Sequence, residues 1–437
     1  MPPRSRSPFP VLMLLFTVAL YGCDDPSSIH GVSVDEPVFA KGGKDRTDPP
    51  GGGDEMVALG ALLFADQDLS LNGNQSCQTC HEPTEGFAAP LSVVTTRGSV
   101  VEGSEPGQFG DRKPPSAAFA TLAPVFAAGG NNASGGNFWD GRATGEILGN
   151  PASDQALGPF LNPKEQAMPD EACVLWRLTQ DVETDYVGAF LSLWNVDLSA
   201  IDFPADVKTV CETFTDMPGE LVALSAVDRA TVREQYQNVA RAIAAFEHSF
   251  NTFDSPFDLG QTTEIEAEGA KLFGSKGKCQ QCHDDKGDTP LFTDFEFHNL
   301  GVPLNPDNPV HNRTSATFDP GLGGVTGDPA HLGKFKTPTV RNVAAGGNRT
   351  YMHNGALMDL RQVVQFYNTR DVLPVCTDEA VLEDPFQWGP DGAGCWPPPE
   401  YPQNLDTKNM GNLGLTDAEV DAIVAFMEAL NGSGGTP

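Results

Sequence analysis

Positive charge is scarce in this chain of 437 residues. Lys and Arg together number 27, whereas Asp and Glu number 59, so the formal net charge is -32. A chain this acidic is repelled by nucleic acid and by anionic membrane surfaces, which argues against nucleic acid as a partner and against adsorption of the protein surface to an anionic membrane. Two interpretations of the acidic surface stay open: it keeps an exported protein well solvated, or it steers a basic protein partner.

A long hydrophobic run is also missing. The apolar run Val11–Leu20 follows Arg4 and Arg6 and is too short to span a bilayer as a permanent anchor. Such a run after basic residues is typical of an export signal. It leads to Gly22 and Cys23, a pattern similar to a bacterial lipobox. We therefore predict a lipoprotein-type signal peptide over residues 1–23 and a periplasmic protein held to a membrane by lipid on Cys23; an ordinary cleavable signal is the alternative.

Sustained alternation of apolar and polar residues, the mark of β-strands, is absent as well. The chain is instead rich in loop-forming residues, with 46 Gly and 36 Pro. Its length is sufficient for two domains with separate cores. The sequence thus predicts a mainly α protein with long loops, short helices and little β structure.

Two short cysteine motifs dominate the chemistry. Cys77-Gln78-Thr79-Cys80-His81 and Cys279-Gln280-Gln281-Cys282-His283 both have the C-x-x-C-H form of a haem c attachment site. In such a site the two thiols bind the haem vinyl groups and the adjacent His becomes an iron ligand. A single C-x-x-C also suits a zinc half-site or a redox pair, but two copies that end in His indicate two covalent haems c.

The remaining cysteines fit an oxidising compartment. Of nine Cys, one is assigned to lipid and four to haem, which leaves an even number for disulfides. Three pairings of these four are possible from sequence alone. We predict the two local pairs, because each lies within one proposed domain: Cys173–Cys211 and Cys376–Cys395.

An internal duplication organises the chain. The pattern G-A-x-L-F, then a loop, then C-x-x-C-H occurs twice, starting at Gly60 and at Gly269. In a cytochrome c unit, a helix before the haem site crosses a helix near the end of the unit. We expect the late helices at Val227–Phe250 and at Leu415–Leu430, the second with a capping box at Thr416. Residues 24–55 predict a flexible tether, residues 56–255 the first haem domain and residues 256–437 the second.

The chain resembles the bacterial di-haem cytochrome c peroxidases, and within them the MauG-like branch. The resemblance runs from about Leu59 to Leu430 and rests on several motifs beyond the haem sites. These are Phe138–Ala143 (FWDGRA), Gln155–Pro159 (QALGP), Asn162–Glu165 (NPKE), Phe292–Val302 (FTDFEFHNLGV), Thr337–Asn342 (TPTVRN), Tyr351–Gly355 (YMHNG) and Val363–Asn368 (VVQFYN).

The resemblance implies a division of labour between the two haems. The haem on His81 would react with peroxide, and the haem on His283 would store and relay electrons. Trp139 matches the tryptophan between the haems in the family. Gln155 and Glu165 match the distal pair over the peroxidatic haem, where a carboxylate can take a proton from bound peroxide and return it to the departing oxygen.

Two departures from the family pattern bear on the iron ligands. No His lies between His81 and His248, so the loop that carries a blocking His in reductively activated members cannot do so here, and the first haem should meet peroxide without prior reduction. Tyr367 falls on the position of the family's Met ligand to the second haem. A phenolate lowers the reduction potential where a thioether raises it. Met352, Met358 and Met410 are the rival ligands.

Calcium stays open. The family binds Ca²⁺ between the haem domains, but Lys113 stands at the position of the Asn that helps to hold it, although the segment Asn348–Thr350 remains. The family also often forms homodimers, so a homodimer is possible here.

Three functions follow from these patterns. The favoured one is a MauG-like enzyme that uses H2O2 to oxidise a residue of a protein substrate. The alternative is a cytochrome c peroxidase that detoxifies H2O2 with a small cytochrome c or cupredoxin as electron donor. A di-haem electron-transfer cytochrome without turnover fits less well, because Glu165 is present and the blocking His is absent.

Overall fold

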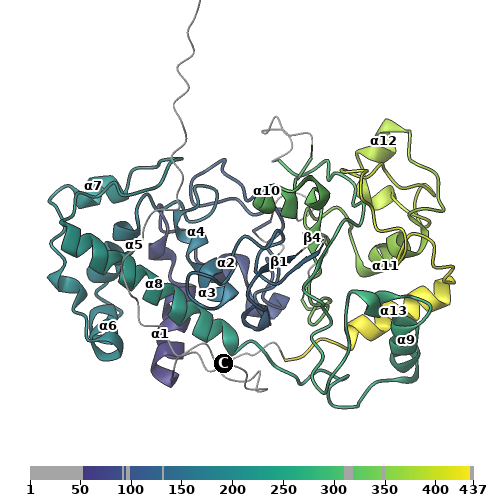
Figure 1. Ribbon diagram of the computed structural model, residues 1–437, viewed down its shortest axis with the longest axis horizontal. Helices are drawn as coiled ribbons and strands as arrows, with labels where there is room; N and C mark the ends of the chain where they lie inside the picture. Colours follow the sequence, from purple (N-terminus) through teal and green to yellow (C-terminus); the bar gives the residue numbers. More distant parts are fainter. Residues whose placement is uncertain are drawn as a thin grey trace, which may run out of the picture. The chain divides into compact units, whose positions relative to one another are not determined.

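The computed structural model describes residues 53–90, 93–94, 99–129, 132–309, 318–346 and 350–433 (Figure 1). The predicted signal peptide, Cys23 and nearly all of the predicted tether lie outside these residues, as do Asn348 and Arg349 of the segment that the calcium expectation invokes. The described residues all belong to one compact unit. Within the described part of the chain, no helix has the length and apolar character needed to cross a membrane.

The described residues are mostly helical, as predicted. The α-helices are α1 (Asp54–Ala65), α2 (Cys77–Cys80), α3 (Pro151–Ala156), α4 (Gly158–Leu161), α5 (Glu171–Gln180), α6 (Tyr186–Trp194), α7 (Val207–Cys211), α8 (Ala226–His248), α9 (Glu264–Gly274), α10 (Leu322–Thr326), α11 (Leu360–Thr369), α12 (Glu379–Leu382) and α13 (Asp417–Glu428). Short 3-10 helices and two antiparallel ribbons are also present, the ribbons being β1 (Ala127–Gly129) with β2 (Asn132–Ser134), and β3 (Phe297–His298) with β4 (Phe335–Lys336).

Two similar helix pairs form the framework. Helix α1 crosses α8, and α9 crosses α13 (Figure 1). At both crossings a glycine lies against the backbone of the partner helix. A Cβ on Gly60 would lie 2.0 Å from the Ala242 carbonyl oxygen, and a Cβ on Gly269 would lie 1.8 Å from the Ala422 carbonyl oxygen. Glycine is therefore required at both crossings. The predicted helices are confirmed, including the Thr416 capping box at the start of α13.

Separate hydrophobic cores surround the two helix pairs. The first gathers residues of α1, α5, α6 and α8, and the second gathers residues of α9, α11 and α13. Arg341, which is 2% exposed, lies against Phe119, Phe253 and Phe292 and makes two hydrogen bonds to the Asp258 carboxylate at 2.8 and 2.9 Å. The division into two haem domains, with its boundary between residues 255 and 256, stays a prediction.

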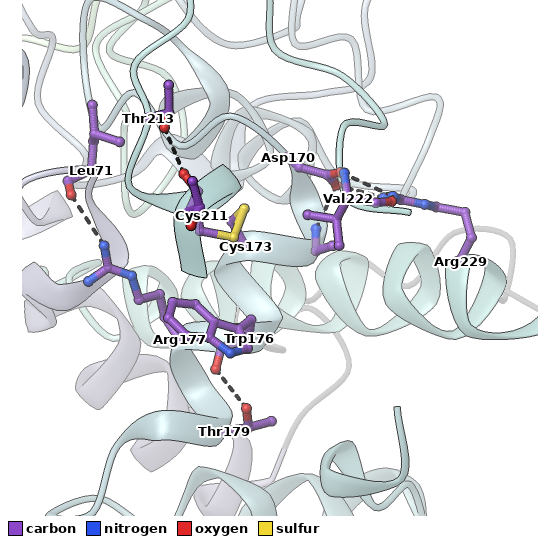
Figure 2. The surroundings of a disulfide bond; sticks show 12 residues. Leu71, Asp170, Cys173, Trp176, Arg177, Thr179, Cys211, Thr213, Val222 and Arg229 are labelled. Atoms are coloured by element: carbon purple, nitrogen blue, oxygen red, sulfur yellow. Dashed lines mark hydrogen bonds and ion pairs between the residues drawn. A yellow bond between two sulfur atoms is a disulfide. The ribbon is translucent and has the colours of Figure 1, made fainter. Parts of the chain in front are cut away.

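Both predicted disulfides are confirmed. Cys173–Cys211 joins α5 to α7, and Cys376–Cys395 closes a loop that follows α11. Figure 2 shows the first disulfide near Asp170, whose carboxylate accepts hydrogen bonds from the Arg229 guanidinium and from the Val222 backbone N–H. The disulfide links α5 to α7, and the ion pair links the start of α5 to α8.

Candidate functional site

The predicted peroxidatic residues converge on one large cavity. Its volume is about 630 Å³. Among the residues that line it are six that the sequence singles out as site residues: Cys77, Cys80, His81, Trp139, Gln155 and Glu165. The structure therefore brings together residues that lie up to 88 positions apart in the chain.

The first C-x-x-C-H motif is built for a tethered imidazole ligand. Helix α2 starts with a capping box formed by Ser76 and Thr79 and presents both thiols to the cavity. His81 Nδ1 lies 3.0 Å from the carbonyl oxygen of Phe87. A carbonyl holds the proton on Nδ1, so Nε2 is the nitrogen left for a metal. Burial also lowers the pKa of His81, which favours the neutral imidazole that binds iron.

The second motif repeats this arrangement. His283 Nδ1 lies 3.0 Å from the carbonyl oxygen of Phe292, and burial lowers the pKa of His283. Phe87 and Phe292 are both fully buried, and both have positive φ, at 59° and 51°. Sequence reasoning missed these two carbonyl partners. Their common signal is a buried Phe a short loop after each motif, at different spacings that conceal the equivalence.

The donor sets fit two haems c better than the competing assignments. Among the described residues, the four motif cysteines are free thiols, as covalent attachment of haem requires. The two pairs line different cavities, so they do not combine into one four-thiolate zinc site. Each pair of thiols next to one oriented imidazole is the set that a covalent haem requires.

The position of Gln155 depends on a loop that is hydrogen-bonded to the neighbouring Asp154. Gln155 lies in α3, which begins with Asn150 as N-cap. The neighbouring carboxylate of Asp154 accepts hydrogen bonds from the backbone N–H groups of Gly145 and Leu148 at 2.7 and 2.8 Å. The long stretch between Ala143 and Gln155 is thereby folded back against α3, and the side chain of Gln155 reaches the cavity.

Glu165 is held in a tight turn after α4. Its backbone N–H donates to the Asn162 carbonyl at 2.9 Å, and its carbonyl accepts from Ser104 N–H at 2.6 Å. Burial raises the pKa of the Glu165 carboxyl above its ordinary value of 4.5, and the nearby Arg142 guanidinium opposes that rise. A carboxyl in the cavity can exchange a proton with a reacting group bound there.

Trp139 lies in the wall between the first cavity and a second one. The second cavity has a volume of about 160 Å³ and is lined by Cys279, Cys282 and His283; Trp139 lines both. The indole Nε1–H donates to the Lys113 carbonyl at 2.8 Å, which fixes the ring orientation. An oxidisable ring thus stands where an electron would pass between the two cavities.

Tyr367 reaches the second cavity from α11, as the ligand prediction requires. Burial raises the pKa of its phenol, so the hydroxyl is protonated unless a metal displaces the proton. Of the rival ligands, Met352 and Met410 also line this cavity, whereas Met358 does not line it. The prediction of Met358 as a rival therefore loses support, because its side chain is buried elsewhere.

The loop over residues 110–116 lines the first cavity and brings no imidazole to it. His81 is the only histidine among the described residues that line this cavity. Arg112 in this loop forms ion pairs with Asp140 at 2.6 Å and Asp319 at 2.7 Å. Sequence reasoning missed this network, because Asp319 lies 207 residues from Arg112 and no local pattern joins them.

Comparison with known proteins gives the family. A family model described as di-haem cytochrome c peroxidase matches residues 54–264. The chain is 34% identical over 394 residues to the methylamine utilization protein MauG of Paracoccus denitrificans, which covers 86% of this chain and 88% of that protein. It is 27% identical over 319 residues to the cytochrome c551 peroxidase of Nitrosomonas europaea, which covers 71% of this chain and 72% of that protein.

A solved structure agrees with these relatives. The diheme peroxidase BthA of Burkholderia thailandensis superposes with a TM-score of 0.66 at 25% identity and covers 89% of this chain and 88% of that chain. The family implies two haems c, and its peroxidases are haem-dependent oxidoreductases that act on H2O2 together with a protein donor or substrate. With the two C-x-x-C-H motifs facing separate cavities, the chain belongs to the di-haem cytochrome c peroxidase family and is a haem-dependent peroxidase.

Proposed function

We propose that this peroxidase reduces H2O2 at the His81 cavity, without prior reductive activation, and withdraws two electrons from a protein substrate by way of the His283 cavity. The observation that carries the proposal is the first cavity, where Glu165 and Gln155 meet His81 and the described lining contains no second His. The overall reaction is H2O2 plus two protons and two electrons giving two molecules of water. The two electrons come from the protein substrate.

Haem c on each C-x-x-C-H motif supplies the peroxide-binding iron in the first cavity and the redox centres for electron transfer. The residues of the chain then supply the proton chemistry. The Glu165 carboxylate accepts the proton from one peroxide oxygen and delivers it to the other as that oxygen leaves as water. The Gln155 amide donates a hydrogen bond that orients the peroxide.

Trp139 and Tyr367 decide where the oxidising equivalents go. Trp139 lines both cavities, so its indole shortens the path for an electron from the second cavity to the first. Tyr367 and His283, which line the same cavity, would hold the second iron. A phenolate favours the more oxidised states of iron, which suits a centre that oxidises a protein substrate more than one that accepts electrons from a soluble cytochrome.

One observation favours the alternative function. Met352 and Met410 line the second cavity together with Tyr367. A thioether ligand would raise the reduction potential of the second haem and suit a cytochrome c peroxidase that takes electrons from a small cytochrome c or cupredoxin. The spectroscopic identity of the sixth ligand separates the two functions.

We also propose that the protein is exported and lipid-anchored through Cys23. The two disulfides support an oxidising compartment. Mass spectrometry of the mature N-terminus tests the anchor: a diacylated Cys23 is expected, and cleavage at another residue without lipid would contradict it.

Stopped-flow mixing of the oxidised protein with H2O2 tests the catalytic assignment. The oxidised wild type should react directly, and Glu165→Gln should lower the second-order rate constant by ~10²–10⁴ while both haems stay bound. Glu268→Gln, on the exposed face of α9, is the matched control and should react as the wild type does. An unchanged rate in Glu165→Gln would remove Glu165 from the mechanism, and a need for prior reduction would overturn the open first site.

A further inference from the structure

Lys113 is a buried lysine in the wall of the first cavity. Its side chain is 7% exposed and lines the cavity that holds Cys77, Cys80 and His81. Two acids of the cavity wall are engaged with other cations, because Arg112 binds Asp140 and Lys164 binds Asp111, whereas Glu165 and Glu247 also line this cavity. No ion pair joins Lys113 to a carboxylate in the part of the chain that the structure describes. Burial alone lowers the pKa of Lys113 to about 8, and no anion offsets that effect.

A second lysine in the same wall, the half-buried Lys336, shows the contrast. The Lys336 ammonium donates to the Gly136 carbonyl at 2.6 Å and to the Asn137 side-chain oxygen at 3.0 Å. Its hydrogen bonds are therefore supplied by the protein. A buried ammonium without an anionic partner is costly, so the cavity around Lys113 is completed by an anion that arrives with the ligand.

We propose that Lys113 binds a propionate of the haem on His81 and ties that haem to Trp139 through its own backbone. This inference rests on the proposed function, since it requires haem on His81. Propionates are the anionic groups of haem, and an ammonium in the cavity wall is a complementary partner for one of them.

The backbone of Lys113 supplies the connection to the second cavity. Its carbonyl accepts the Trp139 indole N–H at 2.8 Å. Its N–H donates to the His353 carbonyl at 2.8 Å, and His353 lines the second cavity. Pro114 and Pro115 follow and restrict the backbone. Lys113 is thus a positioning residue: its side chain faces the first haem while its peptide groups hold Trp139 and the edge of the second cavity.

The reduction potential of the first haem tests the charge. A cation beside a propionate favours the ferrous form, so Lys113→Met should lower the midpoint potential, measured by spectroelectrochemistry on the di-haem protein. We expect at least a tenfold change in the ferric-to-ferrous ratio at a fixed potential, which is about 59 mV for a one-electron couple. Lys113→Arg keeps the charge and should stay closer to the wild type. Lys271→Met on the exposed face of α9 is the control.

The outcomes separate this inference from the proposed function. Wild-type protein that fails to bind two haems would refute the function. Two bound haems, with the same or a higher first-haem potential in Lys113→Met, would refute the Lys113 assignment alone. If Lys113→Met does not load haem, the crystal structure of the haem-loaded wild type decides. An Nζ within about 4 Å of a propionate oxygen supports the assignment, and a longer distance overturns it.

Discussion

Replacement of Gly269 by Ala should loosen the crossing of α9 and α13. The new Cβ would lie 1.8 Å from the Ala422 carbonyl oxygen and 2.8 Å from Phe426 Cβ. Carbon atoms pack best at about 3.5–4.0 Å, so the two helices must separate by ~1.5 Å or more. Both nearby atoms belong to backbone or Cβ positions, which cannot swing aside as the end of a long side chain can.

Two opposing terms decide whether Gly269→Ala lowers or raises the free energy of unfolding. Overpacking in a core costs about 1–3 kcal/mol and occasionally more, and a contact this short against backbone belongs at the upper end. Alanine gains ~1 kcal/mol over glycine in helix propensity. The net expectation is a loss of about 2 kcal/mol of unfolding free energy. The second cavity should change too, because Ile423 and Met427 of α13 line it.

Urea unfolding of the haem-loaded protein, followed by far-UV circular dichroism, measures this loss. The matched control is Gly219→Ala, where nothing lies within 4 Å of the new Cβ. If Gly269→Ala were as stable as the wild type, or more stable by the propensity gain alone, the close crossing would be wrong. The same substitution at Gly60 should affect the first haem in the same way, because Ile243 of α8 lines the first cavity.

Three further outcomes are expected. The peroxide rate should fall as pH drops through a pKa above 4.5, because Glu165 works in its ionised form and burial raises its pKa; a rate that is level down to pH ~4.5 would contradict this. Tyr367→Met should raise the potential of the second haem, read by spectroelectrochemistry, and an unchanged potential would exclude Tyr367 as a ligand. Arg341→Met should cost ~3–5 kcal/mol in urea unfolding, because it leaves the Asp258 carboxylate without its cation, and the loss should shrink when Asp258→Asn is added.

Local signals gave the helix framework of this fold. The capping residues of α13 and the repeated G-A-x-L-F pattern are short-range features, and they located the two helix pairs to within a few residues. The helix α8 begins one residue before the predicted Val227, because Ser225 supplies its N-cap. It ends at His248, two residues before the predicted Phe250. The strands escaped detection, since runs of two or three residues are too short to show a period of two.

In the candidate site, too, the sequence revealed some residues and only the structure revealed others. The C-x-x-C-H motifs identify themselves, and the resemblance supplied Gln155 and Glu165, which do face one cavity. The supporting contacts were not predictable. The Phe87 and Phe292 carbonyls act through backbone, which carries no residue signature. The link from Lys113 to Trp139 joins two loops without periodicity, so only the folded chain reveals it.

Low-temperature EPR of the oxidised protein, before and after one equivalent of H2O2, shows whether the first haem is open to peroxide and whether Tyr367 binds the second. We expect a high-spin ferric signal from the open haem on His81 beside a low-spin signal of His/Tyr type, with both signals lost on addition of peroxide. Two low-spin signals, one of them typical of His/Met ligation, would mean a blocked first iron and a Met ligand to the second. That result would contradict the MauG-like account and favour a cytochrome c peroxidase with a small protein donor.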